Sequence, residues 1–211
     1  METAGERRPY AARLPTAERR EQLLDAALAV ALDRGFHAVT VDGVARAAGV
    51  TRPVVYGLFA DRAALLGALA DRSEQRVLAQ LAGVFPGLPG PDEDVDPDDL
   101  LVAGLGAYLG AVRARPDDWT VILLPPEGAP PGLAERTNAH RRLLLGQLRE
   151  LADWGLARRG GPQGLDPDLF ARAVFTLAEG AARLLLVDPQ RWPVEPFTAF
   201  TRATLAALRR G

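Results

Sequence analysis

The residues able to do chemistry in this 211-residue chain are drawn from few types. Cysteine is absent, which excludes thiolate metal sites, cysteine nucleophiles and disulfides. His37 and His140 are too far apart in sequence to show metal-ligand spacing, and the acidic run over 92–99 lacks the pattern of an EF-hand. No nucleophile, general base and orienting acid are arranged along the chain. We therefore expect no metal, no cofactor and no enzymatic activity.

Arginine is the remaining versatile group, because all 25 basic residues are arginine. A guanidinium presents a planar fork of donors that suits phosphate and the edge of guanine. The exclusive use of arginine extends over the whole chain, however, and compositional bias accounts for it. The formal net charge is −2, so a nucleic-acid site would have to be a local patch of the surface.

The elements that would position these side chains are helices. Periodicity and capping residues predict helices that begin at the N-cap candidates Thr16, Thr40, Thr51 and Asp61 and end near residues 35, 49, 59 and 83. After a loop over 85–99, further helices are expected at about 98–115, about 117–124, about 132–158, about 166–187 and about 194–209. No strand-like alternation is present. The sequence thus predicts an all-α fold with about nine helices.

Three segments follow from this pattern. We expect a flexible basic arm over 1–15, a three-helix domain over 16–66, and a C-terminal helical bundle over 67–211. The longest apolar runs fall far short of the roughly 20 residues that a membrane span needs. No secretory signal is recognisable at the N-terminus. A cytoplasmic location, with no membrane partner, is therefore expected.

Residues 40–59 fit a helix-turn-helix. Two short helices that cross closely need a small residue in the first helix, a residue tolerant of positive φ in the turn, and apolar inner faces. Ala45 and Gly49 supply the first two, and the inner faces are supplied by Val44, Ala48, Val50, Val55 and Leu58. With Thr51 as N-cap, Pro53 falls in the first helical turn, where its missing N–H has no intrahelical partner.

The run ALAVALDRGFHAVTVDGVARAAGVTRPVVYGLFADRAALL contains a GF after the first helix, a T-V-x-x-V-A-x-x-A-G-V core and a V-Y-x-x-F-x-x-R ending. On these motifs, residues 16–66 resemble the DNA-binding domain of the TetR family of transcriptional regulators. The resemblance implies a ligand-responsive repressor that binds a pseudo-palindromic double-stranded DNA operator as a homodimer. It also implies dimerisation through the last two helices and a small-molecule effector bound in the bundle.

The resemblance makes residues 51–59 the recognition helix, which lies in the major groove with its first residues at base edges. Arg52 is the candidate for guanine readout, while Pro53 and Val54 suit contact with a thymine methyl. Phosphate contacts are implied for Tyr56, for Thr40 at one helix N-terminus and for Arg62 near the next. The complete set of predicted DNA-binding residues is Thr40, Arg46, Thr51, Arg52, Pro53, Val54, Tyr56, Gly57 and Arg62.

Two positions depart from the family pattern. Many relatives carry a basic residue at the position of Asp42 and a bulky aromatic residue or histidine at that of Gly57. These departures predict fewer direct contacts and more dependence on Arg52, Arg46 and a basic arm that enters a minor groove through Arg7, Arg8 and Arg13. The alternative role for Arg46 is an ion pair with Asp42, one helical turn earlier.

Aromatic residues of the C-terminal part either line a ligand cavity or fill the core, namely Tyr108, Trp119, Trp154, Phe170 and Phe175. Glu179 and Arg183 lie one turn apart on an otherwise apolar helix. They form a surface pair, a buried pair at a dimer seam, or polar anchors for a ligand. The candidate ligand-binding residues are Tyr108, Trp119, His140, Phe175, Glu179 and Arg183.

Two other classes of function stay open at this point. A helical-bundle enzyme or small-molecule-binding protein without DNA-binding activity would carry polar catalytic groups in its bundle, and the sequence shows none. A protein-interaction adaptor that has lost DNA binding is kept open by Asp42, Gly57 and the nearly neutral N-terminal domain.

Overall fold

The computed structural model describes residues 14–84, 94–159 and 164–209. Within these ranges every regular element is a helix, which confirms the predicted all-α fold. Arg7, Arg8 and Arg13 of the basic arm lie outside the described residues, so their contact with a minor groove stays a prediction. None of the described helices is long and apolar enough to cross a membrane.

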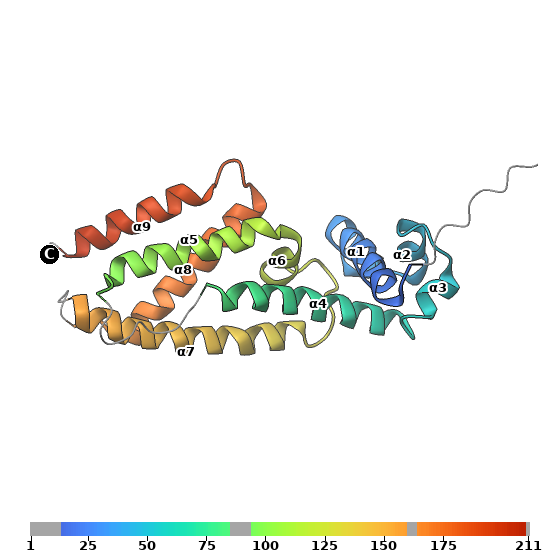
Figure 1. Cartoon of the computed structure of the whole chain (residues 1–211), viewed down its shortest axis with the longest axis horizontal. Helices are drawn as coiled ribbons and strands as arrows, with labels where there is room; N and C mark the ends of the chain where they lie inside the picture. Colours follow the sequence, from blue (N-terminus) through green and yellow to red (C-terminus); the bar gives the residue numbers. More distant parts are fainter. Residues whose placement is uncertain (1–13, 85–93, 160–163, 210–211) are drawn as a thin grey trace, which may run out of the picture.

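The N-terminal domain packs short helices around the start of a long one. Its elements are α1 (Thr16–Arg34), the 3-10 helix η1 (Phe36–Ala38), α2 (Val41–Ala47), α3 (Arg52–Tyr56) and the first turns of α4 (Arg62–Ala82) (Figure 1). Their apolar faces meet in one core, whose largest buried side chains include Phe36, Leu23, Leu65, Leu69, Val44 and Val55. The inner faces of α2 and α3 are therefore held in the core, while their outer faces meet solvent.

Capping residues set where these helices begin. Thr40 Oγ1 accepts the N–H of Gly43 at 3.0 Å, and Asp61 Oδ1 accepts the N–H of Ala64 at 2.8 Å, which confirms both predicted N-caps. Thr16 was wrongly predicted as an N-cap, because it is the first helical residue of α1. The N-cap is instead Pro15, whose ring fixes φ. Its backbone is extended, with φ −53° and ψ 149°, so the helix begins at the next residue.

Thr51 occupies the predicted N-cap of α3, but its side chain makes no capping hydrogen bond. The reason lies in the residues that follow. Pro53 has no N–H to donate, and the N–H of Val54 bonds the carbonyl oxygen of Thr51 at 3.0 Å. α3 therefore starts through backbone bonding and the fixed φ of proline.

The turn between α2 and α3 depends on Gly49. Its φ is +67°, a left-handed conformation that is strained for residues with a Cβ. The N–H of Val50 then bonds the carbonyl oxygen of Ala45 at 2.9 Å and closes the turn. Gly57, by contrast, has φ −66° in the ordinary helical region, so its backbone would accept a larger residue.

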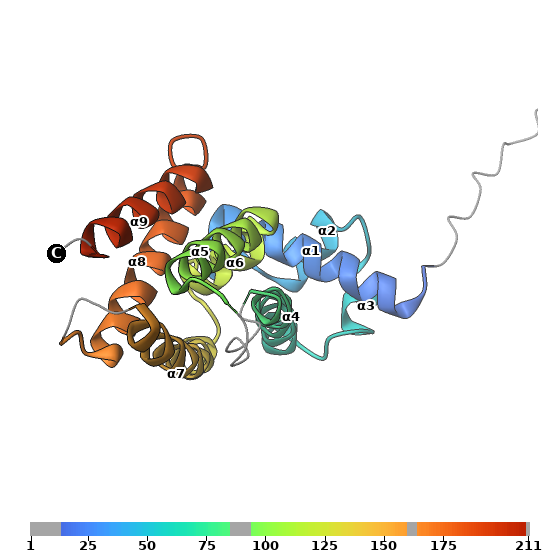
Figure 2. The same cartoon turned by 60° about the vertical axis from the view of Figure 1, so that its left-hand side comes forward.

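The C-terminal bundle consists of α5 (Pro97–Ala114), α6 (Pro116–Leu123), α7 (Leu133–Arg159), α8 (Pro167–Val187) and α9 (Val194–Arg209). α4 leaves the N-terminal domain and runs on into the bundle, where it packs against α6 (Figure 1). In the bundle, α9 packs along α5, and α7 packs along α8 (Figure 2). The expected domain boundary at residue 66 thus falls inside one continuous helix.

α5 begins at Pro97, one residue before the predicted start at about 98, so the predicted 85–99 loop ends before residue 97. Pro97 suits the first helical position, and Asp96 Oδ1 accepts the N–H of Asp98 at 2.8 Å as a cap. Arg209 Nη2 donates to Asp96 Oδ1 at 2.7 Å, and this bond lowers the pKa of the Asp96 carboxyl. The end of α9 is thereby tied to the start of α5.

Candidate functional site

The outer face of α3 presents exposed side chains on a fixed base. Residues 52–54 and Tyr56 are exposed, and Tyr56 leaves 55% of its surface in solvent. Val55 and Phe59 are buried in the domain core. Because the buried residues hold the helix in place, the exposed ones have defined positions. A helix of this kind can enter a major groove with its first residues toward the base edges.

Asp42 at the start of α2 forms a bidentate ion pair with Arg52 at the start of α3. The Arg52 Nε donates to Asp42 Oδ1, and Arg52 Nη2 donates to Asp42 Oδ2. The alternative role of Arg46 as the partner of Asp42 is therefore wrong. The fork of Arg52 meets both carboxylate oxygens at once, an arrangement that is stronger and more directional than a single contact along one helix.

Arg62 at the start of α4 is bound to backbone rather than left free. Its Nε donates to the carbonyl oxygen of Val39 at 2.7 Å, and its Nη2 donates to that of Phe36 at 2.8 Å. These carbonyls belong to the chain just before Thr40, so the guanidinium fixes the approach to α2. A phosphate contact by Arg62 stays a prediction.

The C-terminal bundle contains a cavity of about 1100 Å³. Its lining is mostly aliphatic and aromatic and comes from all the helices of the bundle together with α4. Every predicted ligand residue except Arg183 lines it, namely Tyr108, Trp119, His140, Phe175 and Glu179. Arg183 lies outside the lining, with its Nη2 3.8 Å from Glu179 Oε2.

The aliphatic part of the lining was missed by the sequence analysis. It consists largely of leucines on α4, α5 and α7, namely Leu78, Leu81, Leu101, Leu105, Leu144, Leu148 and Leu151. Leucines at helical spacing are equally typical of a filled core, so periodicity carries no signal for a cavity. Only the distance between the packed helices decides whether such residues touch each other or enclose space.

Charged side chains gather where α7 faces α4 and α8. Arg141 Nε donates to Glu179 Oε1 at 2.7 Å, and His140 Nδ1 lies 2.9 Å from Glu74 Oε1. Burial, with a smaller contribution from the Glu179 carboxylate, raises the pKa of the Tyr108 phenol. Tyr108 thus keeps its proton and can donate a hydrogen bond to a group in the cavity.

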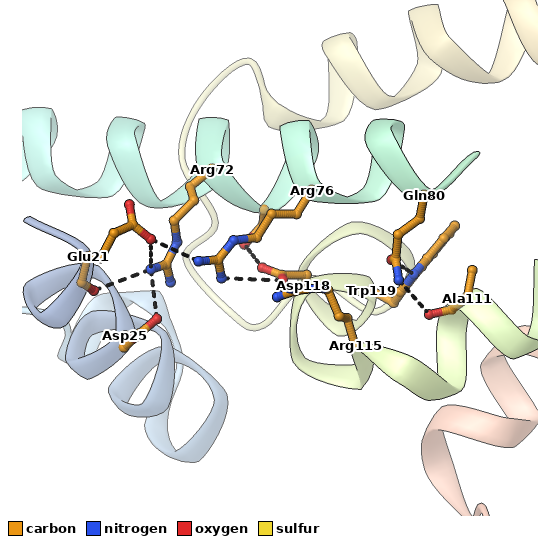
Figure 3. A network of polar contacts seen from close by, with 10 residues as sticks. Glu21, Asp25, Arg72, Arg76, Gln80, Ala111, Arg115, Asp118 and Trp119 are labelled. Atoms are coloured by element: carbon orange, nitrogen blue, oxygen red, sulfur yellow. Dashed lines mark hydrogen bonds and ion pairs between the residues drawn. The ribbon is translucent and has the colours of Figure 1, made fainter. Parts of the chain in front are cut away.

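A row of polar side chains on α4 connects the N-terminal domain to the wall of the cavity (Figure 3). We call Arg72, Ser73, Arg76 and Gln80 the α4 polar row. Arg72 Nη1 donates to Asp25 Oδ1 at 2.7 Å, and Arg76 Nη2 donates to Glu21 Oε2 at 2.8 Å. Both acceptors lie on α1, so two arginines of this row tie α4 to the N-terminal domain.

The α4 polar row also holds α6. Ser73 Oγ donates to Asp118 Oδ1 at 2.8 Å, and Arg76 Nη1 lies 3.6 Å from Asp118 Oδ2. The next residue, Trp119, lines the cavity and donates its Nε1–H to Gln80 Oε1 at 2.9 Å (Figure 3). A continuous set of polar contacts thus runs from Trp119 through α6 and α4 to α1.

Residues 23–69 match the family model of bacterial regulatory proteins, tetR family. Residues 23–69 form a DNA-binding domain of the tetR type. The matched segment runs from α1 to α4 and includes Asp42, Arg52 and the exposed face of α3. The matched family is one of bacterial regulatory proteins, which favours a regulator over the catalytic alternative.

The transcriptional activator FasR from Mycolicibacterium smegmatis is a relative in sequence. It is 45% identical over 76 residues, which are 34% of this chain and 35% of FasR. The matched part thus spans about a third of the length of that TetR-type relative.

Solved structures of TetR-like proteins resemble the whole fold. A TetR-like regulator from Rhodococcus sp. RHA1 has a TM-score of 0.69 at 24% identity and covers 92% of this chain and 99% of its own. FadR from Bacillus subtilis, solved in complex with stearoyl-CoA, has a TM-score of 0.61 at 18% identity and covers 88% of this chain and 96% of its own. At these identities the likeness establishes the fold of both domains.

Proposed function

We propose that this chain is a homodimeric transcriptional regulator that binds operator DNA through α2 and α3 and responds to a ligand in the bundle. The observation that carries the proposal is the exposed face of α3, formed by residues 52–54 and Tyr56, within the segment that matches the tetR family. The relative FasR is an activator, so we propose that the ligand controls operator binding and do not assign the direction of regulation. Repression stays a prediction from the sequence.

Operator recognition divides between bases and backbone. Arg52 at the start of α3 reads O6 and N7 of a guanine, and Val54 contacts a thymine methyl. Tyr56 and Thr40 contact phosphates, which sets the register of the domain on DNA without reading sequence. Arg46 is exposed on α2 and adds positive charge toward the same phosphates.

Apolar side chains on the last two helices support a homodimer. Leu177 and Leu184 lie about two turns apart on α8 and expose 69% and 42% of their surface. The other exposed large apolar residues of α8 and α9 are Leu169, Val187, Phe200 and Leu208. Such exposure favours burial against a partner. A dimer through these helices presents two copies of α3 to successive major grooves of a pseudo-palindrome.

The cavity supports a long apolar ligand with a polar end. Its volume of about 1100 Å³ is large for a small-molecule site, and its lining follows α7 from Thr137 to Arg159. That stretch of helix measures roughly 33 Å at 1.5 Å per residue. Leucines suit an acyl chain, and Arg141 and Tyr108 offer donors to a polar group. Since FadR of similar fold was solved with stearoyl-CoA, we infer a long-chain acyl ligand for this cavity.

Control of DNA binding follows from the α4 polar row. A ligand that contacts Trp119 favours one position of α6, and Asp118 and Arg76 relay that position to α1. The spacing of the two α3 helices in the dimer then changes with the occupancy of the cavity. The ligand acts only to the extent that its affinity differs between the two arrangements.

Selection from random duplex DNA at two salt concentrations tests this function. The wild-type protein is expected to enrich a pseudo-palindrome. Arg52→Ala should lose about 1–3 kcal/mol of discrimination at one base pair of each half-site. Tyr56→Phe should weaken binding to all sequences alike, because it removes a phosphate contact. Enrichment of no sequence, or an unchanged preference in Arg52→Ala, would refute the proposal.

Filling the cavity tests the ligand. Gly104 lines the cavity and has open space where a Cβ would stand, so Gly104→Trp is expected to fill acyl-chain volume without disturbing the fold. We expect stearoyl-CoA at about 100 Kd to stabilise the wild type by about 2.7 kcal/mol and the variant by far less. Thermal unfolding with and without stearoyl-CoA measures this difference.

Gly146→Trp is the matched control for Gly104→Trp. Gly146 lies on α7, also has open space around its Cβ position, and does not line the cavity. It should keep the full stabilisation by stearoyl-CoA. Equal stabilisation of the two variants would show that the ligand binds elsewhere.

A further inference from the structure

The start of α2 and the start of α3 meet in the ion pair between Asp42 and Arg52. We propose that Asp42 is a positioning residue that orients Arg52, so that Arg52 reads one guanine in each operator half-site through the free end of its guanidinium. The proposal rests on operator binding by α3 as proposed above. It goes further by naming the residue that orients Arg52 and the edge of the guanidinium that is left to read the guanine.

The pair is built on two fixed pieces of backbone. Asp42 lies in the first turn of α2, whose start is capped by Thr40, and Arg52 is the first helical residue of α3. The Gly49 turn joins the two helices, and Val44 and Val55 are both fully buried beneath them. Asp42 is therefore held at a set position, and it can impose that position on the long side chain of Arg52.

The atoms in contact decide which part of Arg52 is left for DNA. Asp42 takes the Nε–H and one N–H of Nη2, which form the side-on edge of the guanidinium. Both N–H groups of Nη1 and the second N–H of Nη2 remain, and the end-on edge is formed by one N–H from each of these two nitrogens. Within the described residues, no other side chain or backbone group bonds the Arg52 guanidinium. That end-on edge has the paired donors that match guanine O6 and N7.

The Arg52 side chain is exposed, at 64% of its surface, and without a partner it would sample many rotamers. Fixing one of these rotamers on DNA costs conformational entropy, which opposes binding. If Asp42 already holds Arg52 in one rotamer, less entropy is lost when Arg52 binds guanine. The Asp42 carboxylate also weakens the electrostatic attraction between Arg52 and the DNA phosphates. Asp42 thereby lowers binding to DNA of any sequence while it raises discrimination at one base pair.

Asp42 could also have the opposite effect on Arg52 and hold it away from the DNA. The two roles predict different results when Asp42 is removed. A carboxylate that keeps Arg52 away from the groove would restrain recognition, and its removal would then strengthen binding to the selected site with its base preference kept. Orientation predicts the reverse for preference, because a freed Arg52 would meet phosphates and several bases in turn.

The test measures binding of the full chain to its selected operator and to a version with the read guanine replaced. Asp42→Ala is expected to lower the preference for that guanine by about fivefold or more, the lower end of what one bidentate contact supplies. It should also steepen the salt dependence by about one phosphate contact per protomer, since an acidic charge is removed. In the Arg52→Ala background, the same change should leave the guanine preference unaltered.

Asp33→Ala is the matched control. It removes one exposed carboxylate that is also paired with an arginine, Arg34, but at the end of α1. The control should keep the guanine preference of the wild type. Thermal unfolding of each variant verifies that the domain remains folded.

Three results would overturn the inference. An unchanged guanine preference in Asp42→Ala shows that Arg52 needs no orientation, while the proposed function stands. Tighter binding with its preference kept shows that Asp42 restrains Arg52, and the proposed function again stands. Selection of no sequence by the wild type removes operator binding itself, and with it the inference.

Discussion

Replacing Leu177 with glutamate is expected to convert the dimer into a monomer and to weaken operator binding by about 10²–10⁴-fold, which is the gain from linking two binding modules. Leu177 lies on α8 with 69% of its surface exposed in the single chain. A carboxylate there stays hydrated in the monomer but would lose its water in the proposed α8–α9 interface. Sedimentation and gel shift on the same samples measure both effects.

Leu143→Glu is the control for Leu177→Glu. Leu143 is exposed to a similar extent, 68%, but lies on α7 rather than on the last two helices. It should leave the dimer and operator binding intact. If Leu177→Glu remains dimeric, the interface lies elsewhere, and the exposed leucines of α8 need another explanation.

Replacing Asp118 with alanine should lower the free energy of unfolding by about 2–4 kcal/mol, the combined effect of a lost charged hydrogen bond and a stranded donor. Asp118 is 3% exposed, and it accepts the hydrogen bond of Ser73, which is fully buried. Without the carboxylate, the Ser73 hydroxyl loses the acceptor that it has in the structure, and Arg76 loses its contact with α6. Urea unfolding measures the loss.

Asp117 provides the comparison, because it is the neighbouring residue in the first turn of α6 and is exposed. Asp117→Ala is expected to change the free energy of unfolding by less than about 0.5 kcal/mol. Asp118→Ala should also reduce the effect of stearoyl-CoA on operator binding, because α6 loses its bonds to the α4 polar row. Full ligand control in Asp118→Ala would rule out this route.

α4 contacts both the domain that carries the DNA-binding helices and the ligand cavity. Its first turns belong to the core that holds α2 and α3, and its last turns line the cavity. Between them, Arg76 reaches Glu21 on α1 and Asp118 on α6. The two sites are therefore joined by one continuous helix with polar contacts to α1 and α6.

Helix starts were predictable wherever a residue acts on its own neighbours. Thr40 and Asp61 cap their helices by bonding N–H groups three residues ahead, and Gly49 takes the positive φ that its turn requires. Thr16 was misplaced by one position, because the rigid φ of Pro15 competes with side-chain capping. Sequence signals of this kind are reliable because both partners lie within a few residues.

Candidate site residues were predictable in type but not in their contacts. The DNA-binding set is implied by the resemblance to the TetR family and stays a prediction, whereas most predicted ligand residues do line the cavity. The role of Arg62 in bonding the carbonyl oxygens of Val39 and Phe36 had no sequence signal. The leucine lining had none either, because a leucine beside a cavity and a leucine in a filled core share the same periodicity.

The sequence alone determined the all-α class, the helix-turn-helix and the residues on the outer face of α3, since these depend on local capping, turn conformation and helical period. The tertiary structure decided that Asp42 pairs with Arg52 instead of Arg46, that the bundle helices leave a cavity, and that α4 bonds both α1 and α6. These features join residues from different helices. Their distances are set by how whole helices pack, which no local pattern specifies.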